Sequence, residues 1–165
     1  MRKFLARSTP PGISAAGEVK FFLIWQGLAV LFSLATLARY LSARNALFEW
    51  VAGHRYLVDG AVIADFRTLI GPYFLGFGMV LCAMLGGIIG HYAYYRRGSM
   101  SIYLMKRLPR PFERHRRALT LPLLGAALTA VLALLVYLLY FVIYLLATPK
   151  VCLPDEVWRQ LWRIF

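Results

Sequence analysis

Few residues of this sequence are of types that carry out chemistry. His54, Asp59 and Asp65 share one polar segment and could ligate a metal, but their spacing matches no compact site and no second histidine accompanies them. His91 lies near the basic end of an apolar run, as is typical of an interfacial or helix-packing imidazole. We find no Gly-rich phosphate-binding loop, Gly-x-Ser-x-Gly elbow or His-Glu-x-x-His motif. We therefore predict no catalytic residue, no metal and no cofactor, and expect that the protein is not an enzyme.

The composition is that of a chain whose main solvent is lipid. Hydrophobic residues make up 61% of the sequence and charged residues 16%, with a mean hydropathy of +0.64. Soluble proteins are roughly 45–50% apolar and about 25% charged. The net charge of +12 is concentrated beside apolar runs, which favours contact with anionic lipid head groups over nucleic acid.

Three apolar runs predict three transmembrane helices, at about residues 21–41, 71–95 and 119–147. About 20 apolar residues at roughly 1.5 Å each cross a hydrocarbon core of about 30 Å. A secretory signal peptide is the alternative for the first run, but Arg39-Tyr40 follows where small residues would mark cleavage. The expected fold is an all-α integral membrane protein, a single membrane domain covering residues 1–165.

The charges between the runs predict the orientation. Residues 96–118 contain eight Lys and Arg against the single acid Glu113, whereas residues 42–70 hold as many acids as bases. Positive charge is retained on the cytoplasmic side. Residues 96–118 are therefore expected to be a cytoplasmic loop and residues 42–70 an external one, in the plasma (cytoplasmic) membrane, with the N-terminus cytoplasmic and the tail 148–165 external.

The two external segments carry weaker signals. Asp59-Gly60, between the apolar triplets 56–58 and 61–63, predicts a tight β-hairpin. An interfacial helix containing Phe48, Trp50 and Val51 is an equal alternative for part of this segment. In the tail, apolar residues at helical spacing predict a short amphipathic helix that lies on the membrane surface or in a partner's groove. They are Val157, Trp158, Leu161, Trp162 and Phe165.

Small residues four apart predict close helix packing. The second run contains the pairs Ala83-x-x-x-Gly87 and Gly86-x-x-x-Gly90, and the third adds Gly125, Thr129 and Ala133. Without large side chains, helix backbones approach closely in lipid. The contact is either within the protein's own three helices or with another subunit. Tyr137, Tyr140 and Tyr144 share one face of the third helix, which we expect to pack against protein.

The loop 96–118 offers a candidate docking element. Ser101–Met105 is a short apolar helix candidate between two basic clusters, and Leu108-Pro109 would end it. Ile102 and Met105 would share a face against lipid or a protein groove. The predicted partner-binding residues are Ile102, Tyr103, Met105, Arg107, Arg114, Arg116 and Arg117.

The segment 96–109, RRGSMSIYLMKRLP, with ERHRR at 113–117, resembles small bacterial membrane proteins encoded beside ATP-binding-cassette (ABC) exporters. The resemblance covers about a fifth of the chain and, loosely, its three-span layout. It implies a non-enzymatic transmembrane subunit of an ABC-type export complex. The implied partners are an ABC ATPase docked at the basic loop and a further membrane permease subunit. The alternative is a free-standing membrane protein that binds anionic lipid or regulates a membrane partner.

Overall fold

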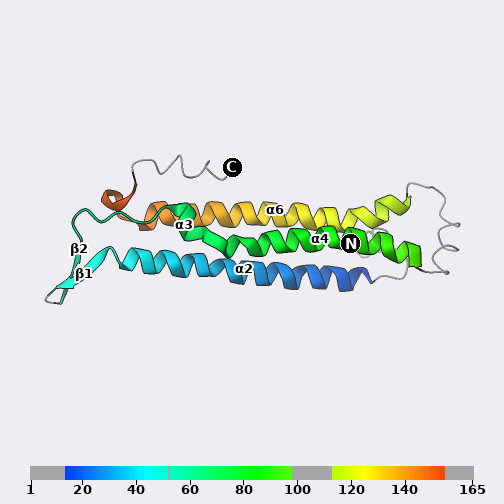
Figure 1. Cartoon of the computed structure of the whole chain (residues 1–165), viewed down its shortest axis with the longest axis horizontal. Coiled ribbons are helices and arrows are strands. Elements are labelled where there is room, and N and C mark those ends of the chain that lie inside the picture. The colour runs from blue at the N-terminus through cyan, green and yellow to red at the C-terminus, as the bar shows by residue number, and fades with distance from the viewer. Residues whose placement is uncertain (1–13, 52, 98–112, 155–165) are drawn as a thin grey trace. The chain divides into compact units, whose positions relative to one another are not determined.

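The computed structural model describes residues 14–51, 53–97 and 113–154, and most of them are helical (Figure 1). Three long helices dominate: α2 (Ala15–Asn45), α4 (Leu75–Arg97) and α6 (Glu113–Ala147). The short α3 (Phe66–Ile70) and the 3₁₀ turn η1 (Gly71–Phe74) precede α4, and a second 3₁₀ turn, η2 (Lys150–Cys152), follows α6.

Three segments are long and apolar enough to cross a membrane, as predicted. They are Ala15–Asn45, Phe66–Tyr94 and His115–Ala147, with mean hydropathies of 2.0, 1.9 and 2.7. Large apolar side chains such as Leu23, Leu31 and Leu139 are more than half exposed, as expected where lipid replaces water. The first and third helices begin before the predicted starts at residues 21 and 119, so Glu18 and Arg116 belong to helices rather than to loops.

The described residues fall into two compact units. One contains residues 14–29, 76–97 and 113–132, and the other contains residues 30–51, 53–75 and 133–154. The first unit holds the N-terminal part of α2 with nearly all of α4, and the second holds α3, η1, η2 and both strands.

An aromatic core organises the second unit. The ring of Phe66, which is 2% exposed, lies 5.1 Å from that of Phe141 and 5.4 Å from those of Tyr137 and Tyr144. Tyr140 is buried as well, and its hydroxyl lies 3.0 Å from the Ser33 hydroxyl. The tyrosine face of α6 therefore packs against protein, which confirms the prediction for these three residues.

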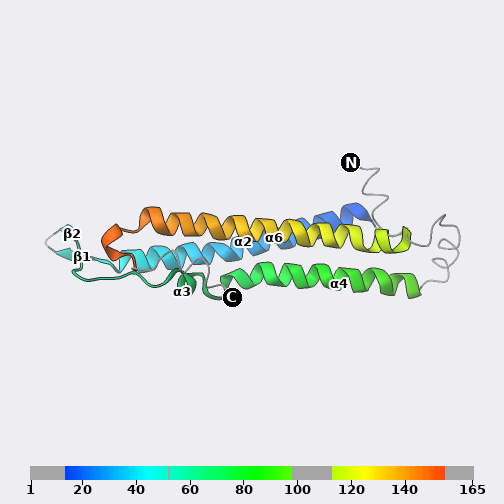
Figure 2. The same cartoon turned by 90° about the horizontal axis from the view of Figure 1, so that it is seen from above.

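The second unit also contains a two-stranded antiparallel hairpin, visible at the end of α2 in Figure 2. Strand β1 (Phe48–Val51) pairs with β2 (His54–Leu57), and Phe48 faces Leu57 in the register. The prediction of strands on either side of Asp59-Gly60 was wrong, and so was the alternative of a helix through Phe48 and Trp50. Gly53, with a φ of 82°, serves the hairpin turn, while Gly60 serves a separate β-turn closed from Ala61 N–H to the Val58 carbonyl.

The predicted C-terminal amphipathic helix concerns residues that lie outside the described part of the chain.

The two cysteines are free: Cys82 is exposed and Cys152 is buried. The carbonyl of Cys152 accepts a hydrogen bond of 3.0 Å from the Ile63 N–H, which ties η2 to the segment before α3.

Candidate functional site

A proline inside α6 creates the first element of the site. Pro122 has no N–H, so the carbonyl of Ala118, one turn earlier, lacks its helical hydrogen-bond donor. Ala118 is fully buried, where an unpaired carbonyl is costly. The imidazole of His91 in α4 supplies the missing donor, because its Nδ1 lies 3.0 Å from the Ala118 oxygen. His91 thus joins α4 to α6 at the carbonyl that Pro122 leaves without a backbone donor.

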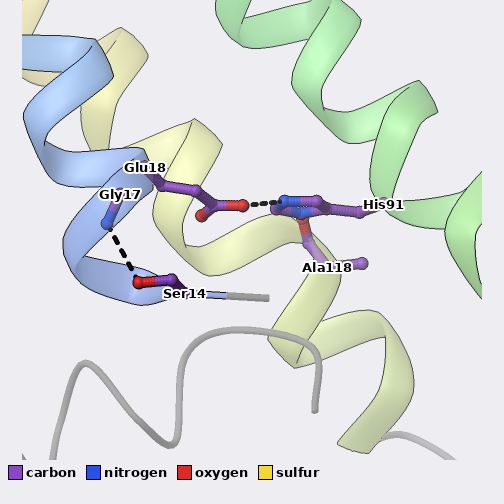
Figure 3. Close-up of polar contacts among 5 residues, drawn as sticks. All are labelled: Ser14, Gly17, Glu18, His91 and Ala118. Carbon is purple, nitrogen blue, oxygen red and sulfur yellow. Dashed lines mark hydrogen bonds and ion pairs between the residues drawn. The ribbon is translucent and has the colours of Figure 1, made fainter. Parts of the chain in front are cut away.

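The second element is Glu18, in the first turn of α2. Ser14 precedes the helix, and its hydroxyl oxygen accepts a hydrogen bond of 3.2 Å from the Gly17 N–H. A carboxylate in a first turn is favoured by the helix dipole. Figure 3 shows the His91 ring between the Glu18 carboxylate and the Ala118 carbonyl. Glu18 Oε1 lies 2.5 Å from His91 Nε2.

Both ring nitrogens of His91 have a hydrogen-bond partner. A carbonyl oxygen only accepts, so Nδ1 carries a hydrogen and donates it to Ala118. Nε2 lies against Glu18 Oε1, so neither nitrogen of this side chain, which is only 7% exposed, is left unpaired.

A cavity of about 710 Å³ adjoins this pair in the first unit. Most of its lining is apolar, including Phe22, Met84 and Leu128, and Glu18 and His91 lie on its wall. Ala83, Gly87 and Gly90 of α4 also line it, so the small residues of α4 leave room that larger side chains would fill.

Two residues of α6, Gly125 and Thr129, contact other helices further along the first unit. Thr129 is fully buried, and its hydroxyl lies 3.0 Å from Gln26 Oε1 and 2.9 Å from the Gly125 carbonyl oxygen. A Cβ at Gly125 would come within 2.9 Å of Met84 Sδ, so this position requires glycine or a shift of Met84. Gly125 and Thr129 were predicted to pack closely, and both are at contacts between helices.

No protein-family model matches the chain, and no curated protein or solved structure matches it either.

The three glycines among the predicted helix-packing residues of α4 make no close contact with another helix in the described part of the chain. A Cβ built at Gly86, Gly87 or Gly90 would meet no atom within 4 Å. Of the four predicted residues, Ala83, Gly87 and Gly90 border the cavity, whereas Gly86 is exposed and does not line it. A contact of this face with another subunit stays a prediction.

The predicted partner-binding residues divide between described and undescribed parts of the chain. Arg114, Arg116 and Arg117 lie in the first turns of α6, and the Arg116 side chain is exposed. Ile102, Tyr103, Met105 and Arg107 lie outside the described residues, so their docking role is a prediction that the structure does not address. Within residues 14–51, 53–97 and 113–154, no three His, Cys, Asp or Glu side chains gather as metal ligands would.

Glu18 is a site residue that the sequence alone did not indicate. The predicted first helix starts at about residue 21, after Glu18, whereas the helix begins at Ala15 and the Glu18 side chain is only 23% exposed. A signal was present, because Pro122 inside an apolar helix leaves one carbonyl in need of a donor. His91 could have been suggested as that donor, but nothing in the sequence pairs Glu18 with it.

Proposed function

We propose that this protein is a non-enzymatic membrane subunit that assembles with another transmembrane protein, within an ABC-type export complex. The observation that carries the proposal is the open face of α4, where Gly86 is exposed and has open space above it in the described chain. A small-residue face in lipid is a favourable surface for a second helix, because backbones can approach closely there.

The charge distribution supports docking of a cytoplasmic partner. Arg116 and Arg117 lie near the start of α6, at the end of the basic segment 96–118, and the positive-inside rule favours the cytoplasm for this segment. In this proposal, Ile102 and Met105 insert into a groove on the ATPase. Arginine forms bidentate contacts with carboxylates, so these arginine side chains suit an acidic surface of the ATPase beside that groove. The N-terminus is then cytoplasmic and the C-terminus external.

The test is co-purification of an ATPase with the tagged full-length chain in mild detergent. Ile102→Asp with Met105→Asp would place unpaired carboxylates in the interface, and we expect the ATPase to be lost. A comparison variant replaces Arg114, Arg116 and Arg117 by Lys, which keeps the charge and should weaken binding only where a bidentate arginine contact is lost. Membrane insertion is checked for both variants.

Two outcomes would contradict the proposal. The double Asp variant could insert normally and keep the ATPase at wild-type stoichiometry, in which case the segment 101–105 does not dock it. The wild-type chain could instead purify without any stoichiometric partner and bind liposomes in proportion to their anionic lipid. That result would favour the free-standing lipid-binding protein.

A further inference from the structure

The cavity of the first unit has the size and lining of a binding site for a small molecule. Its volume of about 710 Å³ lies within the roughly 300–1,000 Å³ typical of such sites. Phe21, Phe22, Leu124 and Leu128 supply apolar surface from α2 and α6. A molecule that fills this space must therefore have a largely apolar body.

The polar part of the cavity selects the charge of that molecule. Glu18 is the one acid among the described lining residues, and no Lys or Arg is among them. Only Oε1 of Glu18 is engaged by His91, and a carboxylate can accept about four hydrogen bonds. An anionic head group would meet this carboxylate as a like charge, whereas a cation would be attracted to it. Phe21 and Phe22 present aromatic rings, which also attract cations.

We propose that this cavity binds a hydrophobic organic cation, with its apolar body among the phenylalanine and leucine side chains and its positive charge at the Glu18 carboxylate. The Glu18 side chain is 23% exposed, so the charge can be reached from outside the helices.

The cation meets Glu18 at the carboxylate oxygen that His91 does not engage, since His91 contacts only Oε1. Glu18 from α2 and His91 from α4 are the charged or titratable groups among the lining residues, and His91 keeps its bond from Nδ1 to the Ala118 carbonyl when the cation is bound.

The experiment measures equilibrium binding of tetraphenylphosphonium to the full-length protein in nanodiscs of neutral phosphatidylcholine. We expect one saturable site. Glu18→Gln removes the charge and should weaken binding by about tenfold or more, as is typical of losing a contact with a charged group. Glu49→Gln, which neutralises an exposed acid in β1, is the matched control and should bind like the wild type.

A second pair of variants tests the cavity itself. Gly87 lines the cavity and has open space at its Cβ, so Gly87→Leu should fill the cavity without displacing a neighbour, and lower the affinity. Gly27→Leu makes the same change in α2, at an exposed glycine that also has open space at its Cβ but does not line the cavity, and should leave the affinity unchanged. Tetraphenylborate, measured alone, has the same shape with a negative charge and should show no saturable binding.

Three results would overturn the proposal: wild-type affinity in Glu18→Gln, equal effects of Gly27→Leu and Gly87→Leu, or saturable binding of tetraphenylborate as tight as that of the cation. Detergent size exclusion of each variant shows whether the fold is retained. Because the isolated chain is used, the result does not depend on whether an ATPase partner exists.

Discussion

At the scale of single residues, Pro122 and His91 form a compensating pair. Proline removes one hydrogen bond from α6, and the imidazole of His91 returns one at 3.0 Å from the Ala118 oxygen. In lipid no water can donate a hydrogen bond to this carbonyl, so α6 depends on the His91 side chain as the donor. The same ring contacts Glu18, and so one histidine connects segments of all three long helices within the first unit.

This reasoning predicts that the stability contributed by His91 depends on Pro122. His91→Ala leaves the Ala118 carbonyl and Glu18 without their partner and should lower the free energy of unfolding by about 1–3 kcal/mol. Pro122→Ala restores an N–H that can bond Ala118, so the cost of His91→Ala should be smaller in that background. A double-mutant cycle of unfolding in detergent measures the difference. Costs that agree within about 0.5 kcal/mol in the two backgrounds would mean that the two positions are independent.

At the scale of elements, the C-terminal half of α6 is held by aromatic packing. Tyr144 is 1% exposed, its ring lies against Phe66, and its hydroxyl donates a bond of 3.3 Å to the Ala64 carbonyl. Ser33 and Tyr140 add a hydroxyl pair between α2 and α6. Such hydroxyl contacts between membrane helices are modest, at about 0.6 kcal/mol on average, so ring packing accounts for most of the stability.

Two substitutions at Tyr144 separate the ring from its hydroxyl. Tyr144→Ala empties a fully packed site and should lower the free energy of unfolding by about 3–5 kcal/mol. Tyr144→Phe keeps the ring and loses only a long hydrogen bond, so its cost should be about 1 kcal/mol or less. Thermal unfolding followed by circular dichroism measures both. Equal losses in the two variants would show that the hydroxyl, not the ring, holds this element.

At the scale of the whole molecule, function depends on which side of the membrane each segment faces. Residues 96–118 contain eight Lys and Arg, whereas residues 42–70 contain equal numbers of acidic and basic residues. The proposed docking to a cytoplasmic ATPase requires the first of these segments to face the cytoplasm.

Thiol labelling of intact cells tests this orientation. With Cys82 and Cys152 replaced by alanine, a cysteine at Val62, which is 62% exposed, should react with a membrane-impermeant reagent. A cysteine at Ser99 should react only after the cells are opened. Val62 is preferable to Gly60, whose φ of 74° would strain any other residue. The reverse labelling pattern would place the basic segment outside and remove the basis for docking.

The three segments able to cross a membrane could be located in the sequence, because this ability requires only a run of apolar residues of sufficient length, which is a local property of the chain. It also indicated that the face of Tyr140 and Tyr144 packs against protein, because three tyrosines at helical spacing seek partners in a lipid environment. The hairpin was misplaced because two glycines compete as turn residues. The Asp-Gly signal at Gly60 is the stronger local one, but pairing of Phe48 with Leu57 brings the turn to Gly53.

The site could not be located from the sequence. Glu18 and His91 are 73 residues apart, and their contact depends on how each helix is rotated about its own axis. The hydropathy of a span carries no information about that rotation, since nearly all its faces are apolar. For the same reason the glycines of α4 could be recognised as a small face but not as the lining of a cavity, which exists only because the side chains opposite them leave the space unfilled.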